Sequence, residues 1–438
     1  MRIGAAAGGD TAMIKRVLWS LLVLLALAGL LVWMLNFWGG PRIHDLPPTT
    51  PPGADQVARG AYLARAGNCM LCHTERGGAS YAGGRPIATP FGTVFSSNLT
   101  PDAATGLGGW SAAHFRRALH EGRSRDGHLL YPAFPYNHTT YVTGADADAL
   151  FDYLRSLPAV SKPNLPHRLR WPYHTQAALA VWRALYFRPE KFEEDPAHTP
   201  EWNRGAYLVK GLGHCGACHT ARNALGGTNE LTDLSGGLIP MQNWYAPSLS
   251  SSNQAGVADW PLAEIEQLLA TGTTPRATVQ GPMAEVVLHS LQYLEPGDIR
   301  AVAVFLKSLP PTPGDTDPRE VPQASAALLA RGGKLYEQQC AQCHGDRGKG
   351  VPGAYPALAG NRAITLPVTA NLVQMVLNGG FAPATRGNPR PFGMPPFATH
   401  LSDAEVAAVL TYVRASWGNR AAPVSELEVT QQRSSTRP

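Results

Sequence analysis

The most specific chemistry in this 438-residue chain belongs to its six cysteines, which form three copies of Cys-x-x-Cys-His and leave no cysteine over. Two thiols one helical turn apart can add across the two vinyl groups of a porphyrin, while the adjacent imidazole binds the iron. The spacing therefore predicts three covalently bound c-type haems. The thioether positions are Cys69, Cys72, Cys215, Cys218, Cys340 and Cys343, and the proximal iron ligands are His73, His219 and His344.

Zinc and disulfides are the alternatives for these cysteines. A zinc site would take its ligands from two such motifs, so three copies would leave one motif without a partner. Disulfides do not require a histidine after each second cysteine. A Gly-x-Gly-x-x-Gly sequence at 211–216 overlaps the second motif and follows a predicted helix rather than a strand, so it does not predict a dinucleotide site.

Charge and composition exclude some functions. The net charge of +5 is small for 438 residues and nothing in it suggests nucleic-acid binding. No constellation of general acid, general base or nucleophile stands out, so no catalytic residue is assigned. Whether the chain is an enzyme stays open at this point.

The apolar run Val17–Leu35 is long enough to cross about 30 Å of hydrocarbon as a helix. Arg2, Lys15 and Arg16 precede it, which places the N-terminus in the cytoplasm and the bulk of the chain outside. A cleaved signal peptide is disfavoured because 36–41 contains no small-x-small cleavage site. We expect a single-pass anchor in a bacterial inner membrane, with the haem domains in the periplasm.

Each haem motif is expected to lie between an opening and a closing helix. The opening segments contain a small residue that permits close helix contact: Gly60–Leu63, Gly205–Leu208 and Gly332–Tyr336. The closing segments have apolar residues at helical spacing: Ala147–Leu157, Pro296–Leu309 and Ser402–Trp417. We expect Tyr153, Phe305 and Tyr412 to pack against the opening helix of their own unit.

The predicted fold class is mainly α, with three tandem cytochrome c-type haem domains after one N-terminal transmembrane helix. The expected divisions are 1–16 cytoplasmic N-terminus, 17–38 anchor, 39–54 spacer, 55–160 unit one, 161–200 connector, 201–310 unit two, 311–324 linker, 325–418 unit three and 419–438 tail. Within the connector, 177–187 is predicted to be helical. The polar stretch 421–438 looks like a disordered tail.

The sixth iron ligand must come from elsewhere in each unit, and a methionine thioether is a common choice that raises the potential. Unit two offers Met283, and unit three offers Met394 in a proline-rich loop. Met241 and Met375 are alternatives, although a methionine is more often core packing.

Unit one differs, because its single methionine, Met70, lies between the two cysteines and cannot reach the opposite face of a haem. Phe134 stands in the loop where a ligand is expected, and His138 follows four residues later. His138 would make this haem bis-histidine and lower its potential relative to the others. The alternatives are a five-coordinate or water-ligated iron, or a competing histidine: His114, His120 or His128.

The chain resembles the membrane-bound tri-haem cytochrome c subunits of bacterial periplasmic dehydrogenases of the alcohol, aldehyde and gluconate type. The resemblance covers nearly the whole chain after the anchor. It rests on Gly-Ala-Tyr-Leu before two haem motifs and on the segments Phe91–Ser111, Tyr131–Ala133, Trp244–Pro247, Gly281–Val287 and Gly393–Pro395.

This resemblance implies that the chain is the electron-transfer subunit of an oxidoreductase complex and is not catalytic alone. The implied partner is a catalytic dehydrogenase subunit of molybdenum, quinoprotein or flavin type, and its electrons pass to ubiquinone or another respiratory acceptor. Phe134 followed by His138 looks more like the cytochromes that accompany molybdenum hydroxylases and aldehyde dehydrogenases. Two other functions remain open at this stage. One is a self-contained, peroxidase-like haem enzyme with an open first haem, and the other is a freestanding electron shuttle.

Overall fold

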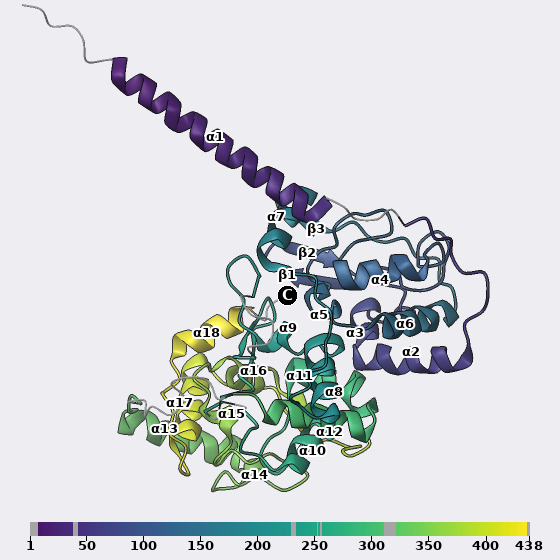
Figure 1. The fold of residues 1–438 in the computed structure, drawn as a ribbon. Helices are drawn as coiled ribbons and strands as arrows, with labels where there is room; N and C mark the ends of the chain where they lie inside the picture. Colours follow the sequence, from purple (N-terminus) through teal and green to yellow (C-terminus); the bar gives the residue numbers. More distant parts are fainter. Residues whose placement is uncertain are drawn as a thin grey trace, which may run out of the picture.

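One long helix projects from a body of short helices and small sheets (Figure 1). The expected linker 311–324 lies mostly outside the part of the chain that this computed structural model describes, as does Trp38 at the end of the expected anchor. The described residues are 8–37, 43–228, 234–251, 253–254, 256–310 and 321–435.

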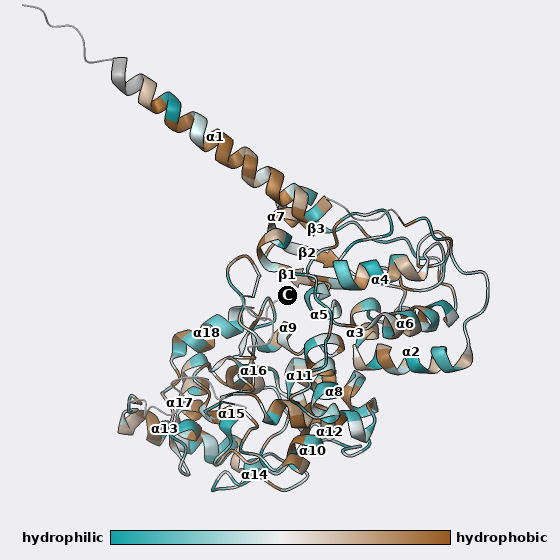
Figure 2. Ribbon diagram, viewed as in Figure 1, coloured by the Kyte–Doolittle hydropathy of each residue, from teal (hydrophilic) through white to brown (hydrophobic). Residues whose placement is uncertain are grey.

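The projecting helix is α1 (Gly8–Phe37), and its surface is hydrophobic along most of its length (Figure 2). Residues Ala12–Phe37 are long and apolar enough to span a membrane, and the most apolar stretch of the helix is not covered by the rest of the protein. Only the last turns contact the body, where Asn36 is buried. An apolar helix of this kind is stable only where lipid or protein surrounds it.

Three pairs of helices cross at close range and form the frame of the body. They are α2 (Ala54–Ala66) with α6 (Gly144–Ser156), α8 (Pro200–Tyr207) with α12 (Pro296–Lys307), and α13 (Ala326–Gln339) with α17 (Asp403–Ala415). The expected contacts of the opening glycines are confirmed. A Cβ added at each would lie within 2.2 Å of a carbonyl oxygen on the closing helix: Gly60 to Ala149, Gly205 to Ala301 and Gly332 to Ala408. The expected aromatic packing is confirmed too, because the same added atoms would meet the Cβ of Tyr153, Phe305 and Tyr412.

Adding one methyl group at such a crossing should force the helices apart. We expect Gly205→Ala to lower the free energy of unfolding by about 3 kcal/mol, because the new Cβ would lie 2.0 Å from the Ala301 carbonyl oxygen. The matched control is Gly297→Ala in α12, where nothing lies within 4 Å of the added atom. Thermal or denaturant unfolding measures both, and equal stability of the two variants would contradict the prediction.

Shorter elements fill the space around this frame. The other α-helices of the described residues are α3 (Cys69–His73), α4 (Ala112–Glu121), α5 (Tyr136–Thr139), α7 (Gln176–Tyr186), α9 (Gly216–His219), α10 (Leu262–Thr271), α11 (Gly281–His289), α14 (Ala341–His344), α15 (Arg362–Thr365), α16 (Ala370–Asn378) and α18 (Glu426–Ser435). A π-helical turn, η1 (Leu208–Leu212), continues α8, and η2 (Leu291–Tyr293) is a 3₁₀ turn. The helix expected at 177–187 is therefore confirmed as α7.

Three small antiparallel sheets lie among the described residues, and the first of them takes a strand from the connector 161–200. The first pairs β1 (Pro86–Thr89) with β2 (Gly92–Phe95), which also pairs with β3 (Arg168–Leu169). The second pairs β4 (Gly237–Ile239) with β5 (Trp244–Ala246), and the third pairs β6 (Gly380–Phe381) with β7 (Gly393–Met394). These strands are two to four residues long, so the fold remains mainly helical, as predicted.

The expectation of a disordered tail is wrong for 426–435, which form α18. Val429 is fully buried, and Arg433 Nε lies 2.5 Å from Asp403 Oδ1 on α17. Ser425 caps the helix, since its hydroxyl accepts a hydrogen bond from the Glu428 backbone. The polar composition suggested disorder because the contacts that hold α18 come from distant residues.

Units one and two share a hydrophobic core, whereas unit three has its own. Two reciprocal side-chain clusters cross the boundary between units one and two. Asp146 accepts from Arg59 Nε at 2.8 Å and from the Tyr207 hydroxyl of unit two at 2.6 Å. Asp298 accepts from Arg204 Nε at 2.8 Å and from the Tyr62 hydroxyl of unit one at 2.6 Å. We call these two clusters the tyrosine–aspartate clamp.

The clamp predicts a pH dependence of stability. Burial opposes ionisation of Asp298, but hydrogen bonds from Arg204 and Tyr62 outweigh it and lower the pKa of this carboxyl. A carboxyl whose pKa is lower in the folded state stabilises the fold above its unfolded pKa of about 4, and this contribution is lost as the pH falls. We expect Asp298→Asn to flatten the fall in unfolding free energy below about pH 4. Denaturant unfolding at a series of pH values measures the slope, and a slope equal to that of the unchanged protein would contradict the prediction.

Unit three docks on unit two through polar contacts. Asn371 of α16 accepts from the Tyr245 backbone N–H at 2.7 Å and donates to its carbonyl at 2.8 Å, so its amide extends β5 as a neighbouring strand would. Arg362 forms an ion pair with Asp259 and donates to the Gly256 carbonyl.

Candidate haem-attachment sites

Each Cys-x-x-Cys-His motif forms a short helical turn after the opening helix of its unit, with the first cysteine of the second and third motifs at the N-cap position. The turns are α3, α9 and α14, and all six cysteines carry free thiols. One turn brings the two thiols of a motif to the same side of the helix. Burial raises the pKa of Cys69 and of Cys215 to about 12, so these sulfurs are neutral thiols.

The three motif histidines share one hydrogen-bonding arrangement. Nδ1 of His73 lies 2.8 Å from the Ser97 carbonyl oxygen, Nδ1 of His219 lies 2.8 Å from that of Pro247, and Nδ1 of His344 lies 3.0 Å from that of Pro356. A carbonyl only accepts, so Nδ1 carries the proton and Nε2 keeps its lone pair. Burial lowers the pKa of all three rings, which keeps them neutral. This is the state that an iron ligand requires, and the residues fit a covalently bound haem.

Two arginines brace the first and second motifs, and sequence reasoning missed them. Arg85 donates to the Leu71 carbonyl at 2.8 Å, and Arg222 donates to the Ala217 carbonyl at 2.8 Å. Both carbonyls belong to the residue before the second cysteine of the motif. The arginines lie at different distances from their motifs along the chain, so no shared spacing could have revealed them.

The first and second motifs lie against each other across the boundary of their units. His214 Nε2 is 3.3 Å from the Gly67 carbonyl oxygen, and a Cβ added at Gly67 would lie 3.2 Å from Leu212 Cδ1. Cys72 also contributes to the raised pKa of the Cys218 thiol, after burial. Any groups bound at these two motifs are therefore neighbours.

His138 has the same arrangement as the three motif histidines. It lies on α5, is 3% exposed, and its Nδ1 is 2.8 Å from the Lys210 carbonyl oxygen, which leaves the Nε2 lone pair available. Burial lowers the pKa of His138 to about 4, although the Lys210 contact acts in the opposite direction. The ring is therefore neutral at physiological pH.

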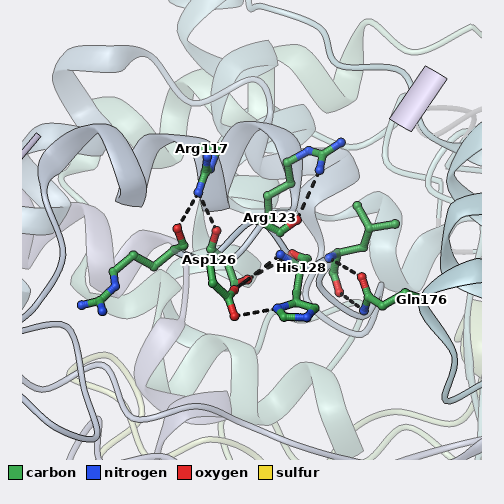
Figure 3. Close-up of polar contacts among 9 residues, drawn as sticks. Arg117, Arg123, Asp126, His128 and Gln176 are labelled. Carbon is green, nitrogen blue, oxygen red and sulfur yellow. Dashed lines mark hydrogen bonds and ion pairs between the residues drawn. The ribbon is translucent and has the colours of Figure 1, made fainter. Parts of the chain in front are cut away.

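The competing histidines of unit one have other surroundings. Nδ1 of His114 lies 2.8 Å from the Ser111 hydroxyl in the capping box of α4. His128 is exposed, with Nδ1 2.6 Å from Asp126 Oδ2 (Figure 3). His120 Nε2 is buried and has no hydrogen-bond partner among the described residues. His120 therefore remains the alternative to His138 as the sixth iron ligand of unit one.

The candidate methionines differ in exposure and position. Met283 is half-buried in the first turn of α11, and Met394 is half-buried on β7, opposite Gly380. Of the alternatives, Met241 is 60% exposed in the turn between β4 and β5. Met375 is half-buried on α16, and its thioether packs near Gly380. Met283 and Met394 stay predictions as iron ligands.

Comparison with known proteins identifies the family. The cytochrome c family model matches residues 57–158 and 329–417, which lie in units one and three. The chain is 37% identical over 405 residues to the cytochrome c subunit of the quinone-type alcohol dehydrogenase of Gluconacetobacter polyoxogenes, covering 88% of this chain and 86% of that one. The chain belongs to the family of dehydrogenase cytochrome c subunits.

Other relatives agree with this assignment. The gluconate 2-dehydrogenase cytochrome c subunit of Pantoea cypripedii is 38% identical and covers 83% of this cytochrome and 86% of its own length. The fructose dehydrogenase cytochrome subunit of Gluconobacter japonicus is 34% identical and covers 88% of this cytochrome and 85% of its own length. Membership of the family implies covalently bound haem c and an electron-transfer role within a dehydrogenase complex.

Proposed function

We propose that this cytochrome carries three covalent haems and passes electrons from a catalytic dehydrogenase subunit to ubiquinone or another respiratory acceptor. The observation that carries the proposal is the repetition of one site three times. Each site has two free thiols on a helical turn and a neutral imidazole whose Nδ1 is held by a backbone carbonyl. A bound haem supplies one-electron transfer, and the protein supplies its attachment, ligands and position.

The second motif belongs in this proposal although the family model leaves unit two unmatched. Its histidine is held like the other two, and its helix pair repeats the glycine contact of units one and three. We assign Met283 and Met394 as the sixth ligands in units two and three, and His138 in unit one. The N-terminal helix would hold the haem domains on the periplasmic side of the inner membrane.

The number of haems is directly testable. We expect the intact mass of the mature protein to equal that of the polypeptide plus three haems, with α1 retained. The double variant Cys340→Ala/Cys343→Ala should retain two haems, because no thiol remains to attach the third. Met241→Ala, at an exposed turn position, should retain three. A wild-type mass with two haems would contradict the assignment of one haem to each motif.

The partner is tested by purification of the full-length protein in mild detergent. A dedicated subunit should emerge with a larger polypeptide that oxidises an organic substrate and reduces the haems of this cytochrome. Reduction of added ubiquinone by that complex would support the proposed acceptor. A cytochrome that is always isolated alone from the native membrane would instead support a freestanding shuttle.

A further inference from the structure

Helix α7 has a buried face and an exposed apolar face. Leu179, Ala180 and Arg183 are buried against the body. Val181 and Leu185, four residues apart and therefore on one face, are 48% and 57% exposed. Trp171, five residues before the helix, is 80% exposed. Exposed apolar side chains gathered on one helix face mark a surface that contacts lipid or another protein.

Helix α7 is fastened to the end of the proposed anchor. Asn36, in the last turn of α1, donates to the Ala180 carbonyl at 2.9 Å and accepts from Arg183 Nε at 3.1 Å. Val32 packs against Leu179 and Ala180 in a small apolar cluster. Figure 1 shows α7 at the base of α1.

The loop after α4 holds α7 from the other side. Gln176 accepts from the Leu129 backbone N–H at 2.8 Å and donates to the Leu129 carbonyl at 3.2 Å (Figure 3). The same loop is closed by Arg117, which donates to the carbonyls of Ser124 and Arg125 at 2.8 Å. The position of α7 relative to the end of α1 is therefore fixed by contacts with both the anchor and unit one.

The length of the anchor places this contact at the membrane surface. Twenty-six residues, Ala12–Phe37, make a helix about 39 Å long, whereas the hydrocarbon core is about 30 Å thick. The last turns of α1, which include Asn36, therefore reach the headgroup region. Because α7 binds these turns, it lies at the same depth.

The charge of the segment around α7 fits an anionic lipid surface. From Leu157 to Pro189 the sequence contains no aspartate or glutamate, and three of its five Lys or Arg residues, Arg168, Arg170 and Arg188, are exposed. The other two do not face solvent freely, because Arg183 is buried against α1 and Lys162 pairs with Glu75. Amphipathic helices that lie in a membrane interface combine such cations with Trp and aliphatic side chains.

We propose that α7 and Trp171 lie in the outer headgroup region of the membrane and form a second membrane contact beside the anchor. This inference rests on the proposed function in that α1 must be inserted. A single helix leaves the attached domains free to tilt, whereas two contacts fix the orientation of unit one relative to the membrane surface. In this arrangement lipid covers the exposed apolar face of α7.

Nitroxide labels on the full-length holoprotein test the proposal. Val181→Cys and Leu185→Cys are labelled separately, because in the proposed holoprotein the six native cysteines are bound to haem and do not react with the label. The proteins are reconstituted into vesicles of phosphatidylethanolamine and phosphatidylglycerol, with the haems reduced to diamagnetic low-spin iron. Relaxation of each label by oxygen, which concentrates in lipid, is compared with relaxation by a water-soluble nickel chelate. Controls are Leu25→Cys in the middle of α1 and Leu427→Cys, exposed on α18 in unit three.

The expected result is an oxygen-to-nickel ratio at positions 181 and 185 at least roughly threefold higher than at Leu427, as for an interfacial helix. A ratio equal to that at Leu427, with Leu25 buried in lipid, overturns the inference and leaves the anchor intact. Labels protected from both reagents also overturn it, because protein then covers the face. If Leu25 is exposed to nickel, the proposed membrane insertion fails and the inference fails with it.

Discussion

Replacement of His138 with alanine is expected to convert about one third of the haem of the resting protein from low spin to high spin, since one iron of three loses its sixth ligand. The buried ring of His138 presents an Nε2 lone pair, fixed by the 2.8 Å contact of Nδ1 with the Lys210 carbonyl. Carbon monoxide should bind the affected haem rapidly once it is reduced. The visible spectrum and the rate of carbon monoxide binding measure the change.

Three further variants separate ligation from structural damage. His114→Ala should leave the spectrum unchanged, because that ring serves the capping box of α4. His138→Met should restore a low-spin haem with a higher potential, since a thioether raises the potential relative to imidazole. If His120→Ala, and not His138→Ala, produces the high-spin haem, the buried Nε2 of His120 is the ligand and our assignment is wrong.

Local sequence patterns predicted the parts of this fold that depend on local interactions. Helix starts are local in this sense: Ser402 and Glu405 form a capping box at the start of α17, and the Thr143 hydroxyl caps α6. The helix pairs were predictable because a glycine in each opening segment and an aromatic residue in each closing segment recur at the same place. Helical periodicity and caps depend on residues at most four positions apart, so a single sequence contains them.

Contacts between distant residues could not be predicted in this way. Helix α18 has few apolar residues, and its stability comes from burial of Val429 and from the pairing of Arg433 with Asp403, 30 residues away. Tyr62 and Asp298 are 236 positions apart, and no pattern in the chain links them. The carbonyl partners of the motif histidines were equally hidden, because backbone acceptors leave no sequence signal.

The clamp gives units one and two a fixed relation that a shared apolar core alone does not specify. Apolar contacts tolerate sliding, whereas hydrogen bonds to a buried carboxylate have defined directions. Each tyrosine crosses the boundary to an aspartate that is already paired with an arginine of its own unit. The arrangement is reciprocal, as expected if the two units are duplicated copies that meet through equivalent residues. It therefore holds the first and second motifs at one separation.

Tyr207→Phe is accordingly expected to lower the free energy of unfolding by about 2–3 kcal/mol, because a carboxyl oxygen of Asp146, which is paired with Arg59, loses a buried hydrogen bond. Asp146 is 2% exposed, so water cannot readily replace the hydroxyl. Tyr62→Phe should cost less, since its partner Asp298 is more exposed. Tyr293→Phe, at a ring that is 40% exposed, should change stability by less than about 0.5 kcal/mol. Denaturant unfolding compares the three variants, and a Tyr207→Phe protein as stable as Tyr293→Phe would show that the clamp does not join the units.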